Sequence, residues 1–95
     1  MTSFWLRRPF EDLGRLDTRW RAIVRDAMET HLRHAPTMVS KSRIKKLRGM
    51  RRPGYRLRID EIRVFYDVSR GLVEVLAVIP KTRASEWLAE WGETE

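Results

Sequence analysis

Three successive strand patterns occupy residues 55–79, and the segments between them are short enough to be hairpin turns. The patterns cover residues 55–59, 62–68 and 72–79. Asp60-Glu61 separates the first two, and Ser69-Arg70-Gly71 separates the last two, with its glycine suited to the turn. We therefore predict a three-stranded antiparallel meander. Its last strand is almost entirely apolar, which predicts a central place in the sheet with a helix over one face.

The first part of the chain predicts one strand and two helices. Phe4-Trp5-Leu6 is a short apolar run that indicates a first strand. A helical period follows, in which apolar positions recur at intervals of three and four residues: Trp20, Ile23, Val24, Ala27, Met28, His31 and Leu32. We expect Asp17 to cap this long helix, a shorter helix around Leu13 and Leu16 to precede it, and Pro36 to end it.

The rest of the chain predicts a connector and a closing helix. Residues 37–54 form a basic connector with turn signals at Gly49 and Pro53-Gly54, and residues 84–91 form a short helix. Together these elements predict one α+β domain over residues 1–95. It consists of an N-terminal strand, two helices, a three-stranded antiparallel meander and a short C-terminal helix, with the helices packed on one face of the sheet.

Composition excludes several kinds of chemistry. The chain has no cysteine, which removes disulfides, thiolate catalysis and zinc fingers and suits a reducing, cytoplasmic location. It has no apolar run long enough for a membrane span, and no signal-peptide pattern at its start. The two histidines, His31 and His34, are explained by helix packing and helix capping. Because metal-ligand spacings and glycine-rich phosphate loops are also missing, we expect neither a metal nor another cofactor.

Positive charge is concentrated in one segment. Residues 41–63 contain ten lysines and arginines and two acids, a balance of +8, whereas the whole chain carries +7. The remaining 72 residues therefore sum to −1. A local concentration of this kind indicates a polyanionic partner, and nucleic acid is the first candidate. The alternative for the connector cations is an ordinary solvated surface.

Three arginines of the predicted meander are expected on one face. Strand alternation puts Arg56 and Arg58 on the same side, and a two-residue turn at Asp60-Glu61 would set Arg58 directly opposite Arg63. Opposed like charges destabilise a sheet by about 0.2–1 kcal/mol, and a bound anion would reverse that effect. The alternative is that these arginines pair with the acidic C-terminal tail or with Asp67.

Cations and an aromatic ring beyond the meander are further candidates for the same surface. Lys81 and Arg83 follow the last strand closely and could reach the arginine face, although both are also explained as helix-flanking cations. The four tryptophans are expected in the core. Trp87 is the one for which base stacking stays open, because it follows these two cations.

Several segments together resemble the RelE/ParE superfamily of type II toxins. The segments are Lys46-Leu47-Arg48-Gly49-Met50, Tyr55-Arg56-Leu57-Arg58, Ile62-Arg63-Val64-Phe65-Tyr66-Asp67-Val68, and Val75-Leu76-Ala77-Val78 followed by Lys81. The resemblance covers nearly the whole chain. It implies a RelE-like fold and a toxin that arrests growth and is neutralised by a cognate antitoxin protein. In the RelE branch such a toxin enters the ribosomal A site and inhibits translation by cleaving mRNA.

The resemblance also implies a reaction and a set of residues. The reaction is attack of a ribose 2′-hydroxyl on the adjacent phosphate, without a metal, to leave a 2′,3′-cyclic phosphate. By position, the catalytic residues are Arg56, Arg58, Arg63 and Lys81. With the connector cations, the RNA-binding residues are then Lys45, Lys46, Arg48, Arg51, Arg52, Arg83 and Trp87.

Two departures from the family pattern bear on proton transfer. Arginine stands where active members often have lysine, and it is a poor general base because its pKa lies above about 12. Trp87 stands in place of a C-terminal tyrosine and cannot exchange a proton. Proton transfer is then left to Lys81, Tyr66, Glu61, Glu86 or a ribosomal group. The alternatives for the whole chain are a gyrase inhibitor of the ParE branch and an inactive toxin homologue that acts only with its antitoxin.

Overall fold

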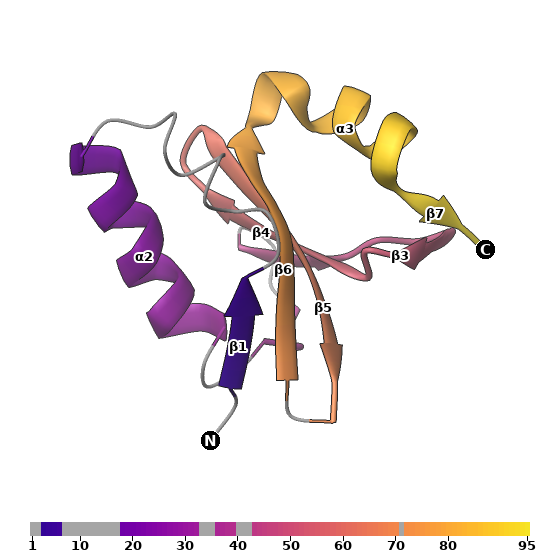
Figure 1. The fold of residues 1–95 in the computed structure, drawn as a ribbon, viewed down its shortest axis with the longest axis horizontal. Helices are drawn as coiled ribbons and strands as arrows, with labels where there is room; N and C mark the ends of the chain where they lie inside the picture. Colours follow the sequence, from indigo (N-terminus) through magenta and orange to yellow (C-terminus); the bar gives the residue numbers. More distant parts are fainter. Residues whose placement is uncertain (1–2, 7–17, 33–35, 40–42, 71) are drawn as a thin grey trace.

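The computed structural model describes residues 3–6, 18–32, 36–39, 43–70 and 72–95, and Figure 1 shows their arrangement. The elements are β1 (Ser3–Leu6), α2 (Thr18–Leu32), β2 (Ile44–Lys46), β3 (Met50–Arg52), β4 (Tyr55–Ile59), β5 (Ile62–Ser69), β6 (Leu72–Pro80), the 3₁₀ turn η1 (Lys81–Arg83), α3 (Ala84–Trp91) and β7 (Glu93–Thr94). The structure is therefore a mixed α+β fold, as predicted. The shorter helix expected around Leu13 and Leu16, and its neighbour Asp17, lie outside the described residues.

A five-stranded sheet has the order β1-β6-β5-β4-β2. The antiparallel meander predicted for β4, β5 and β6 is confirmed, and β6 lies inside the sheet between β1 and β5. β1 pairs with β6 in parallel, so the sheet is mixed and not wholly antiparallel. The register of the β4–β5 hairpin is the predicted one. Asp60 has a φ of 52°, a left-handed conformation that aspartate tolerates in turns.

The two described helices cover opposite faces of the sheet. Val24, Met28 and Leu32 of α2 are buried against one face, in a core that includes Leu57 and Tyr66. On the other face, residues of α3 pack against a smaller buried cluster: Phe65, Ala77 and Ile79. The expectation that the helices share one face is therefore wrong. β5 has buried side chains on both sides, because strand alternation sends Phe65 to the smaller cluster and its neighbours Val64 and Tyr66 to the other core, so each face needs a cover.

The predicted basic connector contains two short strands. β2 pairs with β4 and extends the sheet, while β3 leaves it and pairs with β7 to form a separate ribbon on the α3 side (Figure 1). Ile44 is buried and fixes the face of β2, which a three-residue strand is too short to reveal by alternation. The expectation of a connector without strands is corrected here.

Among the described helices, none is both long and apolar enough to cross a membrane.

Candidate nucleic-acid interface

Four cations gather on the α3 side of the sheet at its β2–β4–β5 end. Leu57, Ile59 and Val64 are buried under α2, so the alternating neighbours Arg56, Arg58 and Arg63 lie on the opposite side. Lys45 follows the buried Ile44 and joins them for the same reason. We refer to Lys45, Arg56, Arg58 and Arg63 as the cationic face. It brings together three of the four predicted catalytic residues and one predicted RNA-binding residue.

Strand pairing arranges the cationic face in two rows. In one row, Lys45 pairs with Arg56, and Arg56 pairs with Phe65. In the next, Arg58 stands directly opposite Arg63, as predicted from the turn. Cations in a row are about 5 Å apart in backbone position, and the rows are separated by about 6.6 Å, twice the rise per residue of a strand. The backbone N–H of Arg58 donates a hydrogen bond to the carbonyl oxygen of Arg43, just before β2, at 2.8 Å.

Arg56 is the least satisfied cation of the cationic face. Its Nε atom is buried and has no hydrogen-bond partner among the described residues. Burial lowers the pKa of Arg56, and the charges of Arg63 and Arg58 lower it further. These perturbations identify a place where positive charge is crowded and an unpaired N–H group remains. An anion bound beside the Arg56 guanidinium would offset the crowded charge.

Arg63 is held by the hairpin turn. Its Nη1 atom donates to the carbonyl oxygens of Asp60 at 2.8 Å and Ile62 at 3.0 Å. Burial lowers the pKa of Arg63 and Arg58 lowers it further, while Glu61 acts in the opposite direction. The guanidinium is therefore fixed in position, and no carboxylate in the described part of the chain forms an ion pair with it.

Lys81 lies at the end of the cationic face, beside the same turn. Its N–H donates to the Glu61 carbonyl at 2.8 Å, and its Nζ is 3.6 Å from the Glu61 carboxylate. Both side chains are largely exposed, so the pair contributes little to stability. The contact nevertheless places an amine and a carboxylate next to the Arg58–Arg63 row.

Trp87 packs on the sheet beside the cationic face. Its ring stacks on Phe65 with centroids 5.0 Å apart and planes 5° from parallel, and Phe65 is the strand neighbour of Arg56. Trp87 belongs to the smaller core cluster and stays partly exposed. The structure therefore assigns it the packing role that the sequence favoured for the other tryptophans.

Other predicted RNA-binding cations lie on different elements or on the other face of the sheet. Lys46 pairs with Tyr55, which packs under α2 on the other side of the sheet. Arg48 and Arg51 are exposed on the loop and on β3, and Arg83 is exposed in η1. Of the predicted cations outside the meander, Lys45 lies next to Arg56 and Lys81 lies beside the turn that joins Arg58 to Arg63.

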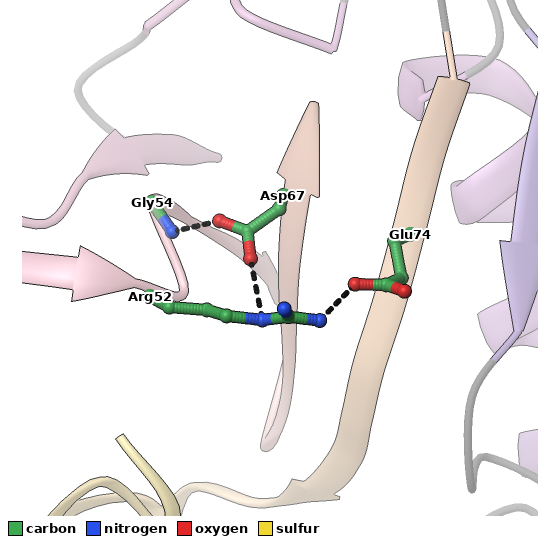
Figure 2. A network of polar contacts seen from close by, with 4 residues as sticks. All are labelled: Arg52, Gly54, Asp67 and Glu74. Carbon is green, nitrogen blue, oxygen red and sulfur yellow. Dashed lines mark hydrogen bonds and ion pairs between the residues drawn. The ribbon is translucent and has the colours of Figure 1, made fainter. Parts of the chain in front are cut away.

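Arg52 is committed to an internal ion-pair network, shown in Figure 2. Its guanidinium pairs with Asp67 at 3.3 Å and also with Glu74. Asp67 and Glu74 stand opposite each other on β5 and β6. The predicted loop at residues 69–71 would have set Asp67 opposite Val73. In the structure Ser69 pairs with Leu72, and this register sets Asp67 opposite Glu74. Pairing with Asp67, weighed as an alternative for the meander arginines, is found for Arg52.

Tyr66 is removed from the candidates for proton transfer. Its ring is buried under α2, on the side of the sheet away from the cationic face. Its O–H donates to the Pro36 carbonyl at 2.6 Å, and burial raises its pKa further above the ordinary value. Tyr66 therefore has a structural role.

Comparisons with known protein families, with curated proteins and with solved structures found no match to this chain. In the part of the chain that the structure describes, no group of three or more histidine, aspartate or glutamate side chains is placed to hold a metal ion. We therefore infer function from the cationic face and its surroundings.

Proposed function

We propose that this chain is a type II toxin that cleaves ribosome-bound mRNA without a metal ion, using the cationic face as its RNA-binding surface. The main support is a contrast between two pairs of like charges, each of which stands across two neighbouring strands. Asp67 and Glu74 face each other on neighbouring strands, and Arg52 compensates them from within the chain. Arg58 and Arg63 also face each other, yet no described carboxylate forms an ion pair with either. A counter-charge from outside the protein explains the second pair.

Single-stranded RNA suits the shape and spacing of this counter-charge site. Lys45 and Arg58 are exposed and Arg56 and Arg63 are half-buried on one face of a sheet, a surface that can follow a flexible backbone. The two rows, about 6.6 Å apart, repeat on the scale of successive phosphates in an extended strand. An arginine guanidinium can present two N–H groups to one phosphate, and this favours phosphate over a carboxylate-bearing peptide of irregular spacing. Sequence-independent binding of this kind depends strongly on salt.

The proposed cleavage divides its tasks between the arginines and the Glu61–Lys81 pair. The 2′-oxygen attacks phosphorus, an O–P bond forms, and the bond from phosphorus to the 5′-oxygen breaks. Arg58 and Arg63 neutralise the charge that builds on the phosphoryl oxygens. Glu61 accepts the 2′-hydroxyl proton, and Lys81 donates a proton to the leaving 5′-oxygen, so the products are a 2′,3′-cyclic phosphate and a 5′-hydroxyl.

A RelE-like fold, a cognate antitoxin and the ribosome belong to the same proposal. The basic hairpin, the long helix on the opposite sheet face and the closing helix beside the cations support it. The antitoxin would supply acidic or apolar residues that cover the cationic face or displace α3.

The test is inducible expression in bacteria followed by mapping of mRNA 5′ ends, with wild type, Arg58→Ala and Arg25→Ala compared. Arg25 is an exposed arginine on α2 and serves as the matched control. We expect new 5′-hydroxyl ends and growth arrest with wild type and Arg25→Ala, and neither with Arg58→Ala. Intact mRNA with normal peptide synthesis in a translating extract would refute the proposal. Inhibited supercoiling in the same cells would replace it with a gyrase inhibitor.

RNA binding without cleavage is the second candidate function. The observation that favours it is the position of Tyr66, since its burial leaves an exposed, salt-bridged pair as the nearest proton-transfer groups. Salt-sensitive binding of single-stranded RNA that leaves the RNA intact, on and off the ribosome, would select this alternative.

A further inference from the structure

The β3–β7 ribbon and the end of α3 form one unit (Figure 1). Gly92 is the single residue between α3 and β7, and its N–H donates to the Leu88 carbonyl at 2.9 Å. Across the ribbon, the Glu95 N–H donates to the Gly49 carbonyl at 3.1 Å. A Cβ added at Gly92 would come within 2.5 Å of the Met50 methyl group, so β3 packs directly on the C-terminal end of α3. Movement of the ribbon therefore carries the end of α3 with it.

Arg52 ties this unit to the sheet. Figure 2 shows its side chain extending from β3 past Asp67 on β5 to Glu74 on β6. Asp67 uses its other oxygen to accept the Gly54 N–H at 2.6 Å, which holds the chain just after β3. All three charged side chains are partly buried. Charge-assisted hydrogen bonds in such a setting are stronger than those of an exposed pair.

The closing helix depends on attachments at its ends. α3 has eight residues, and none of them is buried. Isolated helices shorter than about 12–15 residues are marginal in water. Ala84, Trp87 and Leu88 provide its contact with the smaller core cluster, η1 joins its start to β6, and the ribbon anchors its end.

We propose that Arg52 is a positioning residue, which holds α3 against the sheet through the β3–β7 ribbon and thereby keeps Trp87 beside the cationic face. Trp87 stacks on Phe65, the strand neighbour of Arg56, so the placement of α3 shapes the surface next to the least satisfied cation. The effect on RNA rests on the proposed function. The effect on α3 does not.

Amide hydrogen exchange tests the structural part. We expect Arg52→Ala to speed amide exchange in β3, β7 and α3 about tenfold, while α2 keeps its protection. The magnitude corresponds to the loss of one to two hydrogen bonds between charged groups in a partly exposed setting. Arg51→Ala removes the exposed neighbouring arginine of the same strand and should leave α3 protection unchanged. Unchanged α3 protection in Arg52→Ala, or an equal loss in α2 and α3, overturns the inference.

Two milder variants keep the test decisive if Arg52→Ala does not fold. Glu74→Gln removes one ionic partner at nearly constant size, and Arg52→Lys keeps the charge but reaches the two carboxylates less well. We expect both to loosen α3 less than Arg52→Ala and more than Arg51→Ala. If α3 in either variant is as well protected as it is in Arg51→Ala, Arg52 is rejected as the anchor.

RNA cleavage assays test the functional part. Across Arg52→Ala, Arg52→Lys and Glu74→Gln, cleavage should fall in proportion to α3 protection, with KM rising more than kcat falls, and Arg52→Lys should lose less than Arg52→Ala. A loosened α3 with unchanged KM and kcat overturns the functional part. If wild type itself cleaves no RNA, the proposed function fails, while the exchange measurement still decides whether Arg52 positions α3.

Discussion

Replacing Arg58 with glutamine should make the protein more stable and less able to bind RNA. Arg58 stands directly opposite Arg63, and it lowers the pKa of both Arg56 and Arg63. Like charges at this position cost about 0.2–1 kcal/mol. Arg58 is exposed, so the lower half of that range applies, and the expected rise in Tm is roughly 1–4 °C for a domain of this size. Arg58 is the better partner to change, because Arg63 would also lose its two bonds to the turn.

The assay is thermal unfolding at two salt concentrations, with RNA binding measured in parallel. The stability gain should shrink between about 0.01 and 0.15 M salt, because the screening length falls from about 30 to 8 Å. Arg25→Gln on α2 removes the same charge away from the cationic face and should change neither Tm nor affinity as much. A lower Tm for Arg58→Gln at low salt, or an unchanged RNA affinity, refutes the reasoning about the opposed pair.

Three further predictions concern the rest of the fold. Leu57→Ala should lower the free energy of unfolding by about 2–5 kcal/mol, because this side chain is fully buried, whereas Ile23→Ala, at 42 % exposure, should cost far less in the same urea titration. Gly92→Ala should lower Tm, since the added Cβ would lie 2.5 Å from the Leu88 carbonyl oxygen; an unchanged Tm contradicts the packing at this point. Burial is the main cause of a raised pKa at Asp67, so the folded state binds this proton more tightly than the unfolded state does. As the pH falls from neutral toward the ordinary value of 3.8, wild type should therefore gain stability relative to Asp67→Asn, and a flat or declining difference contradicts this sign.

The β4–β5 hairpin could be predicted because its information is local. Two strand patterns separated by Asp60-Glu61 determine the register once the turn has two residues, and the register determines that Arg58 faces Arg63. At the next hairpin the predicted loop was one residue too long, and the observed pairing of Ser69 with Leu72 sets Asp67 opposite Glu74. The counter-ion of that second pair could not be predicted in the same way. Arg52 lies 22 residues before Glu74, and only the fold brings them together.

The two faces of the sheet could not be assigned to helices from the sequence. β6 is apolar on both sides, which indicates burial but does not identify what covers each side. α3 has an apolar side that fits either face, and in the structure it packs on the smaller cluster of Phe65, Ala77 and Ile79, with the ribbon at its end. The short strands β2 and β3 were missed because three residues carry too little alternation.

By itself, the sequence determined the α+β class, the meander, the register of its first hairpin and the concentration of cations on one side of two strands. These features follow from local alternation and turn length. Tertiary structure alone decided which cations share a surface, because that depends on pairings between distant segments. It added Lys45 and Lys81 to the arginines, withdrew Arg52 into an ion-pair network and buried Tyr66 on the opposite face. The outcome is an acid pair compensated by Arg52 and an arginine pair with which no described carboxylate forms an ion pair.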